Sequence, residues 1–199
     1  METTIKIKVI IGSTRPNRFS EKPAFWILEE VRKKEGVTAE LLDLRDYPMP
    51  FFDQPIPPAM SGGKYANEIV KTWAEKIKDG DAFIIVTPEY NHGYPAVLKN
   101  ALDMIFLEWN KKPVGFVSYG NAGGARSVEQ LRQVVIELQM VPIKNAIHIA
   151  SDLYRTIMNE KIPVNPDLFK PLRNPVDRVE TFLNELITIA RVLKTAPGV

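Results

Sequence analysis

The first residues of the chain alternate between apolar and polar side chains and then become uniformly apolar. In TIKIKVIIGS, residues 4–13, isoleucines alternate with lysines before the run from Val9 to Ile11. This pattern is typical of a strand that enters a buried sheet. From Ser20 the spacing becomes helical, with apolar side chains at Ala24, Ile27, Leu28 and Val31. Ser20 is the predicted N-cap, and Pro23 falls in the first turn, where its missing N–H costs nothing.

The two patterns keep alternating along the rest of the chain. Further strands are predicted over residues 37–46 and 141–150. Residues 81–91 are predicted as a strand that runs into a loop, and residues 112–124 as a strand followed by a Gly-rich loop. Further helices are predicted over residues 64–80, 95–109, 125–139 and about 175–194. The proline-rich segment 46–63 can form neither a helix nor a central strand, so we expect a loop that is a site wall or an interface. A second segment broken by prolines, residues 151–175, follows the fifth strand.

Five short strands separated by helices predict an α/β fold. The expected architecture has three layers, with helices on both faces of a five-stranded parallel sheet. Right-handed crossovers leave two common strand orders, and five strands in 199 residues favour the flavodoxin-like order 2-1-3-4-5 over half of a dinucleotide-binding fold. No internal repeat or linker divides the sequence, so we expect residues 1–199 to form one domain.

Three unusual loops follow the first, third and fourth predicted strands. Their sequences are GSTRPNRFS, TPEYNHGYP and SYGNAGGARS. In an open parallel sheet, ligands bind at the carboxyl ends of the strands, where the strand order reverses. All three loops leave the sheet at that edge, so their convergence predicts a ligand site there.

The first loop combines small, hydroxyl and basic residues before a helix. Ser13, Thr14 and Ser20 offer hydroxyl groups, Arg15 and Arg18 offer positive charge, and the helix N-terminus offers unpaired N–H groups. These groups suit a terminal phosphate monoester. The loop lacks the GxxxxGK[ST] pattern of triphosphate sites and the GxGxxG pattern of dinucleotide sites. The alternative is a capped helix followed by two solvated arginines.

The second and third loops can present backbone groups to a flat ring. Prolines close both ends of the second loop, and Gly93 is expected to take a positive φ. His92 is a weak catalytic candidate, because no serine or cysteine partner is evident. Gly120, Gly123 and Gly124 allow close backbone approach in the third loop, and Tyr119 could stack on a ring. A phosphate site beside two such loops indicates flavin mononucleotide (FMN).

Composition narrows the chemistry further. The chain has no cysteine and only two histidines, which argues against disulfides, thiol chemistry and a metal site. Any redox reaction must therefore belong to a bound cofactor. The net charge of +2 argues against nucleic acid as the main partner. No membrane span or signal peptide is evident, so we expect a cytoplasmic protein.

The segments GSTRPNR, PEYNHGYPAVLKNALD and SYGNAGGARS resemble the signatures of the NADPH-dependent FMN reductase family. The resemblance covers about residues 6–149 and departs at Asn17, where a small residue is usual; asparagine also tolerates the left-handed conformation. It implies phosphate contacts from Ser13, Arg15, Arg18, Phe19 and Ser20. It implies ring contacts from Pro88, Glu89, Tyr90, Asn91, His92, Gly93, Ser118, Tyr119, Gly120, Gly123 and Gly124. It implies FMN as cofactor, NADPH or NADH as co-substrate, and a small-molecule electron acceptor.

An oligomer is predicted from the helix over residues 95–109. Its apolar side chains span roughly 200°, twice the stripe that a surface helix needs. These side chains are Val97, Leu98, Ala101, Leu102, Met104, Ile105, Phe106 and Trp109. The resemblance likewise implies a homodimer or a dimer of dimers. The alternative is burial of this arc under the proline-rich loop or the segment after residue 150.

Three functions compete at this stage. The favoured one is an FMN-dependent NAD(P)H oxidoreductase of the flavin, quinone or azo reductase type, with hydride transfer to flavin N5 and no catalytic side chain. The second is a flavodoxin-like electron carrier without NAD(P)H activity, although carriers are typically acidic. The third is a phosphate-binding protein without flavin, for which the stiff second loop would have no purpose.

Overall fold

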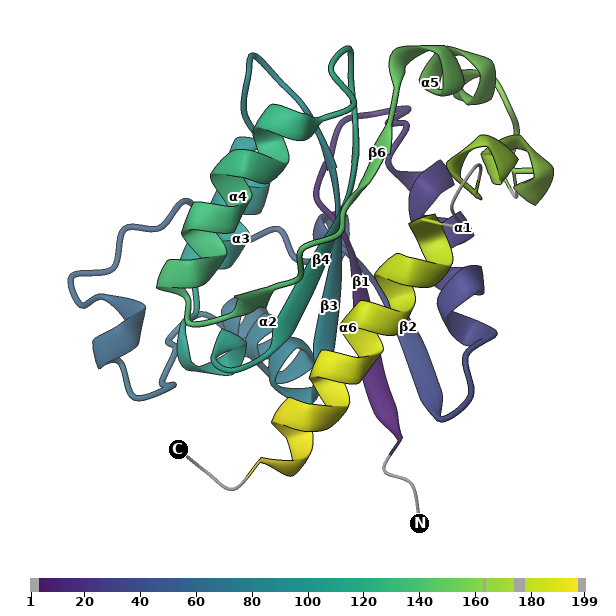
Figure 1. Cartoon of the computed structure of the whole chain (residues 1–199). Helices are drawn as coiled ribbons and strands as arrows, with labels where there is room; N and C mark the ends of the chain where they lie inside the picture. The colour runs from purple at the N-terminus through teal and green to yellow at the C-terminus, as the bar shows by residue number, and fades with distance from the viewer. Residues whose placement is uncertain (1–3, 163, 174–177, 197–199) are drawn as a thin grey trace.

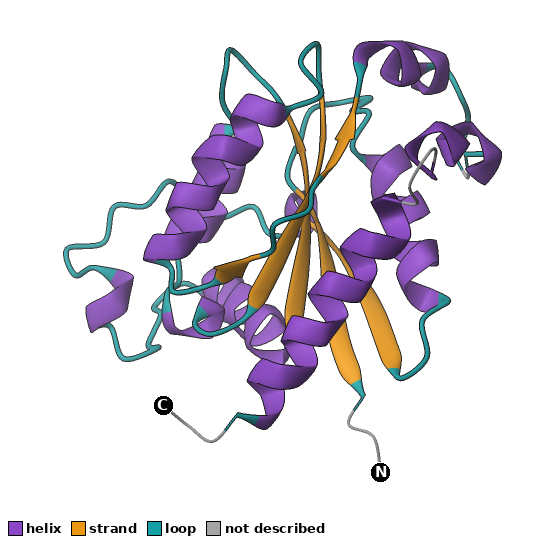
Figure 2. Ribbon diagram, viewed as in Figure 1, coloured by secondary structure: helices purple, strands orange, loops and turns teal. Residues whose placement is uncertain are grey.

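The computed structural model describes residues 4–162, 164–173 and 178–196. Six parallel strands form one sheet that lies between two layers of helices (Figures 1 and 2). The strands are β1 (Ile5–Ile11), β2 (Val37–Asp43), β3 (Ala82–Pro88), β4 (Pro113–Tyr119), β5 (Val141–Pro142) and β6 (Ile147–Ile149). The helices are α1 (Glu21–Arg32), α2 (Glu68–Asp79), α3 (Ala96–Asp103), α4 (Ala125–Glu137), α5 (Ser151–Met158) and α6 (Arg178–Thr195). Among the residues described, no helix is long and apolar enough to cross a membrane.

The strand order confirms the predicted fold. The sheet runs β2-β1-β3-β4-β5, and β6 is an extra strand that also pairs with β4. Every neighbouring pair is parallel. The order reverses between β1 and β3, because β1 leads to β2 on one side and β3 lies on the other. The first and third strands therefore end side by side, as the site prediction requires.

The period of two along the strands divides the core between the faces of the sheet. Ile5, Ile7, Val9 and Ile11 pack with α1 and α6, whereas Ile10 packs on the opposite face with α2, α3 and α4. Figure 1 shows α6 across the near face and α4 and α3 on the other side. Two helical layers bury both faces, which explains why these strands are apolar almost throughout.

The predicted fifth strand is divided in two. β5 pairs with the start of β4, and β6 pairs with its end. Between them, the backbone N–H groups of Lys144 and Asn145 donate to the carboxylate of Glu185 on α6, at 2.8 and 3.1 Å. Because these amides bind a helix side chain instead of the neighbouring strand, the ladder is interrupted and the sheet has six strands.

The helix predicted over residues 95–109 ends at Asp103. Beyond it the chain turns beneath α2, and Ile105 and Trp109 are fully buried, with the Trp109 ring 5.0 Å from that of Phe83. Leaving the helix buries these side chains within the same chain, which a straight helix would not do. The arc of apolar residues is thus mostly core, and its use as an argument for an oligomer is wrong.

Gly115 is required where α6 crosses β4. A Cβ atom there would lie 2.5 Å from two ring carbons of Phe182, which is fully buried. We expect Gly115→Ala to lower the free energy of unfolding by about 1–3 kcal/mol through overpacking. Urea denaturation measures this, and Gly115→Ala/Phe182→Leu should recover part of the loss. A single variant as stable as the parent would contradict the packing described.

Candidate functional site

A cleft of about 310 Å³ opens at the carboxyl ends of the strands. Its walls come from the loops after β1, β3 and β4, which are the three loops selected from the sequence, and from α5. The lining residues are Arg15, Asn17, Arg18, Phe19, Lys22, Pro88, Glu89, Tyr90, Tyr119, Gly120, Asn121, Tyr154 and Met158. The convergence expected from the strand order therefore exists as a cleft in the folded chain.

Tyrosine hydroxyls meet both serines of the first loop. Ser13 Oγ lies 2.9 Å from Tyr90 Oη, and Ser20 Oγ lies 2.6 Å from Tyr119 Oη. Both serines are buried, behind the residues that line the cleft. Ser20 precedes α1 as predicted, but its own backbone is helical and its side chain caps nothing, so the predicted side-chain cap is wrong. These two bonds tie the first loop to the second and third loops.

Arg18 is turned away from solvent and bound to carboxylates. Its guanidinium makes a two-pronged contact with Asp43 at the end of β2, with Nη1 2.8 Å from Oδ1. Nε donates to Glu21 at 3.0 Å, and Nη1 also donates to the carbonyl of Ser13. Burial alone would raise the pKa of Asp43, but hydrogen bonds and charge from Arg18 and Arg45 lower it. Arg18 thus braces the loop from behind.

Arg15 is the exposed cation of the first loop. Its guanidinium carbon lies 5.6 Å from the centre of the Tyr90 ring, at the wall of the cleft. Asn17 has φ 52°, which confirms that asparagine takes the left-handed conformation expected at this departure from the family pattern. The loop keeps its shape without glycine, and Arg15 remains free of carboxylate partners among the ion pairs of the described residues.

The second loop is a tight two-residue turn. The backbones of Tyr90 and Gly93 exchange hydrogen bonds of 2.8 and 3.1 Å across it. Asn91 and His92 at its tip have φ 49° and 76°, so the positive φ predicted for Gly93 falls on these two residues instead. A Cβ at Gly93 would lie 2.8 Å from Oε1 of Gln130, so that exposed side chain would have to move to admit one. Asn91 and His92 point into solvent and do not line the cleft.

Two helix N-termini face this region, and they differ in charge compensation. At α4, the carboxylate of Glu89 accepts from the Arg126 N–H at 3.1 Å and from its Nε at 2.8 Å. The hydrogen bond from the Arg126 side chain is the main cause that lowers the pKa of Glu89. The N-terminus of α1 has no side-chain cap. Glu21 lies in the first turn of α1, but its carboxylate is bound by Arg18 and Arg45. An anion bound in the cleft therefore finds an uncapped helix end at α1, beside Arg15.

The third loop folds back on the end of β4. Ser118 Oγ donates to the carbonyl of Gly123 at 2.8 Å and lies 2.8 Å from His148 Nδ1 on β6. Burial lowers the pKa of His148, which favours the neutral ring. Gly124 has φ 77°, and a Cβ there would lie 2.7 Å from the Tyr119 nitrogen. Backbone packed this closely needs glycine, so the loop can bring its own N–H groups next to a flat ligand.

The predicted site residues thus divide into three groups. Eight line the cleft: Arg15, Arg18, Phe19, Pro88, Glu89, Tyr90, Tyr119 and Gly120. Five lie behind it as support: Ser13, Ser20, Ser118, Gly123 and Gly124. Asn91, His92 and Gly93 form the turn at its edge. The Tyr119 ring packs against the rings of Phe19 and Tyr154, at 4.8 and 5.9 Å, so it is not free to stack as predicted.

Sequence reasoning missed Lys22, Asn121, Tyr154 and Met158 in the cleft wall. Asn121 lies within the third predicted loop and Lys22 lies two residues after the first, so proximity in sequence could have included them. Tyr154 and Met158 belong to the segment after residue 150, which carries no pattern that would place it at the strand ends. Only the folded chain brings that segment to the cleft.

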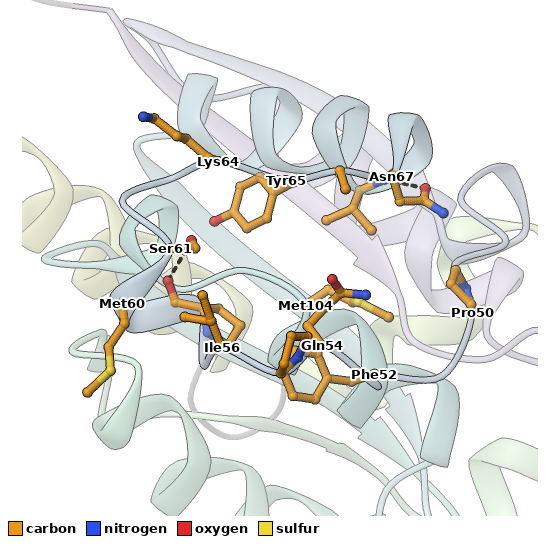
Figure 3. Close-up of a pocket in the computed structure, with 14 residues that line it drawn as sticks. Pro50, Phe52, Gln54, Ile56, Met60, Ser61, Lys64, Tyr65, Asn67 and Met104 are labelled. Carbon is orange, nitrogen blue, oxygen red and sulfur yellow. Dashed lines mark hydrogen bonds between the residues drawn. The ribbon is translucent and has the colours of Figure 1, made fainter.

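A second hollow lies on the side of the sheet that α2 and α3 cover, under the proline-rich loop. It has a volume of about 350 Å³, and apolar side chains such as Phe52, Ile56 and Met104 line most of it. Figure 3 shows Tyr65 and Lys64 on one side and Ile56 and Phe52 on the other. It shares no lining residue with the cleft. We assign the functional site to the cleft, because the uncapped end of α1 and the exposed Arg15 are there.

Known proteins are similar to this chain in sequence and in fold. The model of the NADPH-dependent FMN reductase family matches residues 5–153. An NAD(P)H-dependent FMN reductase of Schizosaccharomyces pombe is 40% identical over 154 residues, covering 76% of this chain and 77% of that protein. An FMN-dependent NADPH-azoreductase of Staphylococcus aureus is 32% identical over 147 residues, covering 70% and 75%. A flavoenzyme NAD(P)H:(acceptor) oxidoreductase of Paracoccus denitrificans has the same fold, with a TM-score of 0.66, 21% identity, and coverage of 93% and 98%.

Proposed function

This chain belongs to the NADPH-dependent FMN reductase family and is an FMN-dependent NAD(P)H oxidoreductase, and we propose that FMN binds in the cleft. The observation that carries the placement is the difference between the two helix N-termini. Glu89 neutralises the end of α4, whereas α1 presents an uncapped end beside Arg15. A phosphate dianion is therefore attracted to the N-terminus of α1 more strongly than to that of α4, where Glu89 already occupies the helix end.

At the phosphate end, we assign the contacts to Arg15 and to the backbone of the first loop. Arg15 is exposed and free to turn toward the cleft, whereas Arg18 is bound to Asp43 and Glu21. Arg18 is therefore a positioning residue that fixes the loop. Ser13 and Ser20 hold the loop to Tyr90 and Tyr119 in the structure described, and their hydroxyls lie directly behind the cleft wall.

At the ring end, the backbones after β3 and β4 supply the cradle. Pro88 and Glu89 on one side and Gly120 on the other line the cleft, and the Glu89 N–H already donates to the Tyr119 carbonyl at 3.0 Å. This bond joins the two loops into one rigid wall. Rigid backbone dipoles suit a planar ring system whose charge changes during reaction, because they need no reorganisation.

The chemistry that bound FMN supplies is hydride acceptance at N5 and electron transfer to a second substrate. The chain's own contribution is to hold the cofactor in register with the nicotinamide and to present fixed N–H groups to developing negative charge. We assign no general acid or base, because His92 points into solvent and His148 is bound to Ser118.

The function is tested by replacing Arg15. We expect Arg15→Ala to raise the dissociation constant for FMN about 10- to 100-fold, since a charge-assisted phosphate contact contributes about 1.5–3 kcal/mol. At saturating FMN, the rate of NADPH oxidation should stay within about twofold of the parent, because the phosphate that Arg15 binds takes no part in hydride transfer. Flavin fluorescence titration and steady-state kinetics measure the two quantities.

The matched control is Arg32→Ala, at the other end of α1. Arg32 is exposed and pairs only with Glu29 among its described contacts, so the same charge is removed far from the cleft. Equal FMN affinity in Arg15→Ala, Arg32→Ala and the parent would show that the phosphate does not bind at this loop. A colourless parent protein that takes up no FMN would contradict FMN binding altogether. The alternative of a phosphate-binding protein without flavin would then be favoured.

The acceptor and the assembly are finer proposals. Relatives act on different acceptors, as the names of the Staphylococcus aureus azoreductase and of a 28% identical 2-hydroxy-1,4-benzoquinone reductase of Burkholderia indicate. We propose a small aromatic acceptor of the quinone or azo type for this chain. NADPH consumption with a quinone separates this enzyme from a flavodoxin-like carrier. A cytoplasmic homodimer or dimer of dimers, built from a single domain over residues 1–199, completes the proposal.

A further inference from the structure

The segment after β6 forms part of the cleft, although all but its first three residues lie beyond the match to the family model, which ends at residue 153. It consists of α5 and a short 3-10 helix over Pro166–Arg173. Figure 1 shows α5 at the top of the molecule, above α1 and beside the loops that follow β3 and β4. From α5, Tyr154 and Met158 reach the wall of the cleft.

Tyr154 joins two predicted site residues in a cluster of aromatic rings. Its ring lies 4.7 Å from that of Phe19 at an angle of 64°, and 5.9 Å from that of Tyr119 at 7°. Phe19 belongs to the first loop, and Tyr119 is bonded to Ser20 at the start of α1. The contacts of Tyr154 therefore place it beside Phe19 and the start of α1, at the phosphate end of the cleft.

The whole segment is fixed to the helix that carries this phosphate end. The Lys22 ammonium group donates to the carbonyl of Met158 at 2.7 Å and to that of Glu160, at the C-terminus of α5. Further along, the ring of Phe169 stacks on Trp26 of α1, 4.3 Å apart and 8° from parallel. Because α5 is anchored at both its C-terminal end and the following 3-10 helix, Tyr154 keeps its place relative to the first loop.

Resting on the proposed function, we infer that the Tyr154 ring closes the phosphate end of the FMN site and contacts the bound cofactor there. Tyr154 is half-buried, so one part of its surface packs on Phe19 and Tyr119 while another remains open to the cleft. A flat ring at this point excludes water from the phosphate and its partners. Lower local polarity strengthens the charge-assisted hydrogen bonds to phosphate, which slows cofactor release.

The test compares three substitutions of Tyr154. We expect Tyr154→Ala and Tyr154→Leu to raise the dissociation constant for FMN about tenfold, mainly through faster release, because both remove a flat ring contact. Tyr154→Phe keeps the ring and should stay within about threefold of the parent. The preference for FMN over riboflavin should fall in the alanine and leucine variants, since the contact is at the phosphate end. A purely structural role would leave this preference unchanged.

The control is Arg155→Ala, one residue along α5, which is exposed and does not line the cleft. It should bind FMN like the parent, and thermal unfolding without FMN should show all variants folded. Parent-like FMN affinity in Tyr154→Ala and Tyr154→Leu, or equal weakening in Tyr154→Phe, would overturn the assignment to the ring. These outcomes require a parent that binds FMN, so they are distinct from a parent that binds none, which would overturn the proposed function itself.

Discussion

Asp43→Ala is expected to lower the free energy of unfolding by about 3–5 kcal/mol, because it leaves the buried guanidinium of Arg18 without its main partner. Only 1% of the Arg18 side chain is exposed, and Asp43 holds it by two hydrogen bonds at the end of β2. Glu21 remains as a weaker partner at 3.0 Å. The first loop should loosen as well, because the same guanidinium binds the Ser13 carbonyl. Urea denaturation and FMN titration measure the two effects.

Two variants separate the ion pair from a general loss of charge. Asp46→Ala removes an exposed carboxylate three residues away and should change stability by less than about 0.5 kcal/mol. Arg18→Met/Asp43→Ala removes both partners and should be more stable than Asp43→Ala alone, because no buried charge is left. A double variant that is less stable than Asp43→Ala would contradict the view that the unpaired guanidinium causes the loss.

The same pair gives an acid-dependent signature. The pKa of Asp43 is lowered from 3.8 in the folded chain, so its carboxylate contributes stability above that value. This contribution is lost as the pH falls through 3.8 toward the lower folded pKa, because the unfolded chain then binds more protons. The stability difference between the parent and Asp43→Ala should therefore shrink in strong acid. A difference that stays constant from neutral pH to about pH 3 would exclude Asp43 as its source.

Gly124→Ala should be the other severe substitution, with a loss of about 2–5 kcal/mol. A left-handed residue other than glycine costs about 1–3 kcal/mol, and overpacking costs a similar amount. At Gly124 both apply, because φ is 77° and a Cβ would lie 2.6 Å from the Ser118 Cβ and 2.7 Å from the Tyr119 nitrogen. One of these atoms is backbone and the other is the Cβ of the fully buried Ser118, so neither can move cheaply. Thermal and urea unfolding measure the loss.

Gly62→Ala is the matched control for this substitution. Gly62 has a similar φ of 61°, but no atom lies within 4 Å of the position that its Cβ would take. It isolates the cost of the backbone conformation, about 1 kcal/mol, from the cost of the close approach. Equal losses in the two variants would mean that the loop after β4 relaxes freely. Such a loop could not serve as a rigid cradle for the flavin ring.

The position of the cleft follows from short-range patterns. Alternation and apolar runs in β1, β3 and β4 depend only on which faces of a strand are buried, and that is written in the sequence itself. Right-handed crossovers then fix the order of the strands, and the order brings the three loops to one edge. The left-handed Asn17 belongs to the same class, because it depends on one residue's own backbone preference.

Longer-range competition decided what the patterns left open. Residues 141–150 do not indicate that the backbone N–H groups of Lys144 and Asn145 donate to Glu185, which divides the one predicted strand into two. The helix predicted to extend to Trp109 ends at Asp103. The reason is that the Trp109 side chain packs against Trp73 of α2, which it reaches because the chain leaves the helix. In each case a residue distant in sequence supplies a hydrogen bond or a buried contact that the locally predicted element would not make.

The sequence by itself determined the succession of strands and helices, favoured the observed strand order, and placed the three unusual loops with their hydroxyl and basic residues at one edge of the sheet. Tertiary structure alone decided which of two arginines is free, because Asp43 arrives from a neighbouring strand and binds Arg18. It alone brought Tyr154 to the cleft, through its contact with the ring of Phe19, which lies more than a hundred residues earlier in the chain. Backbone periodicity is a local property, whereas the partner of a charge or a ring is settled by whatever the fold places beside it.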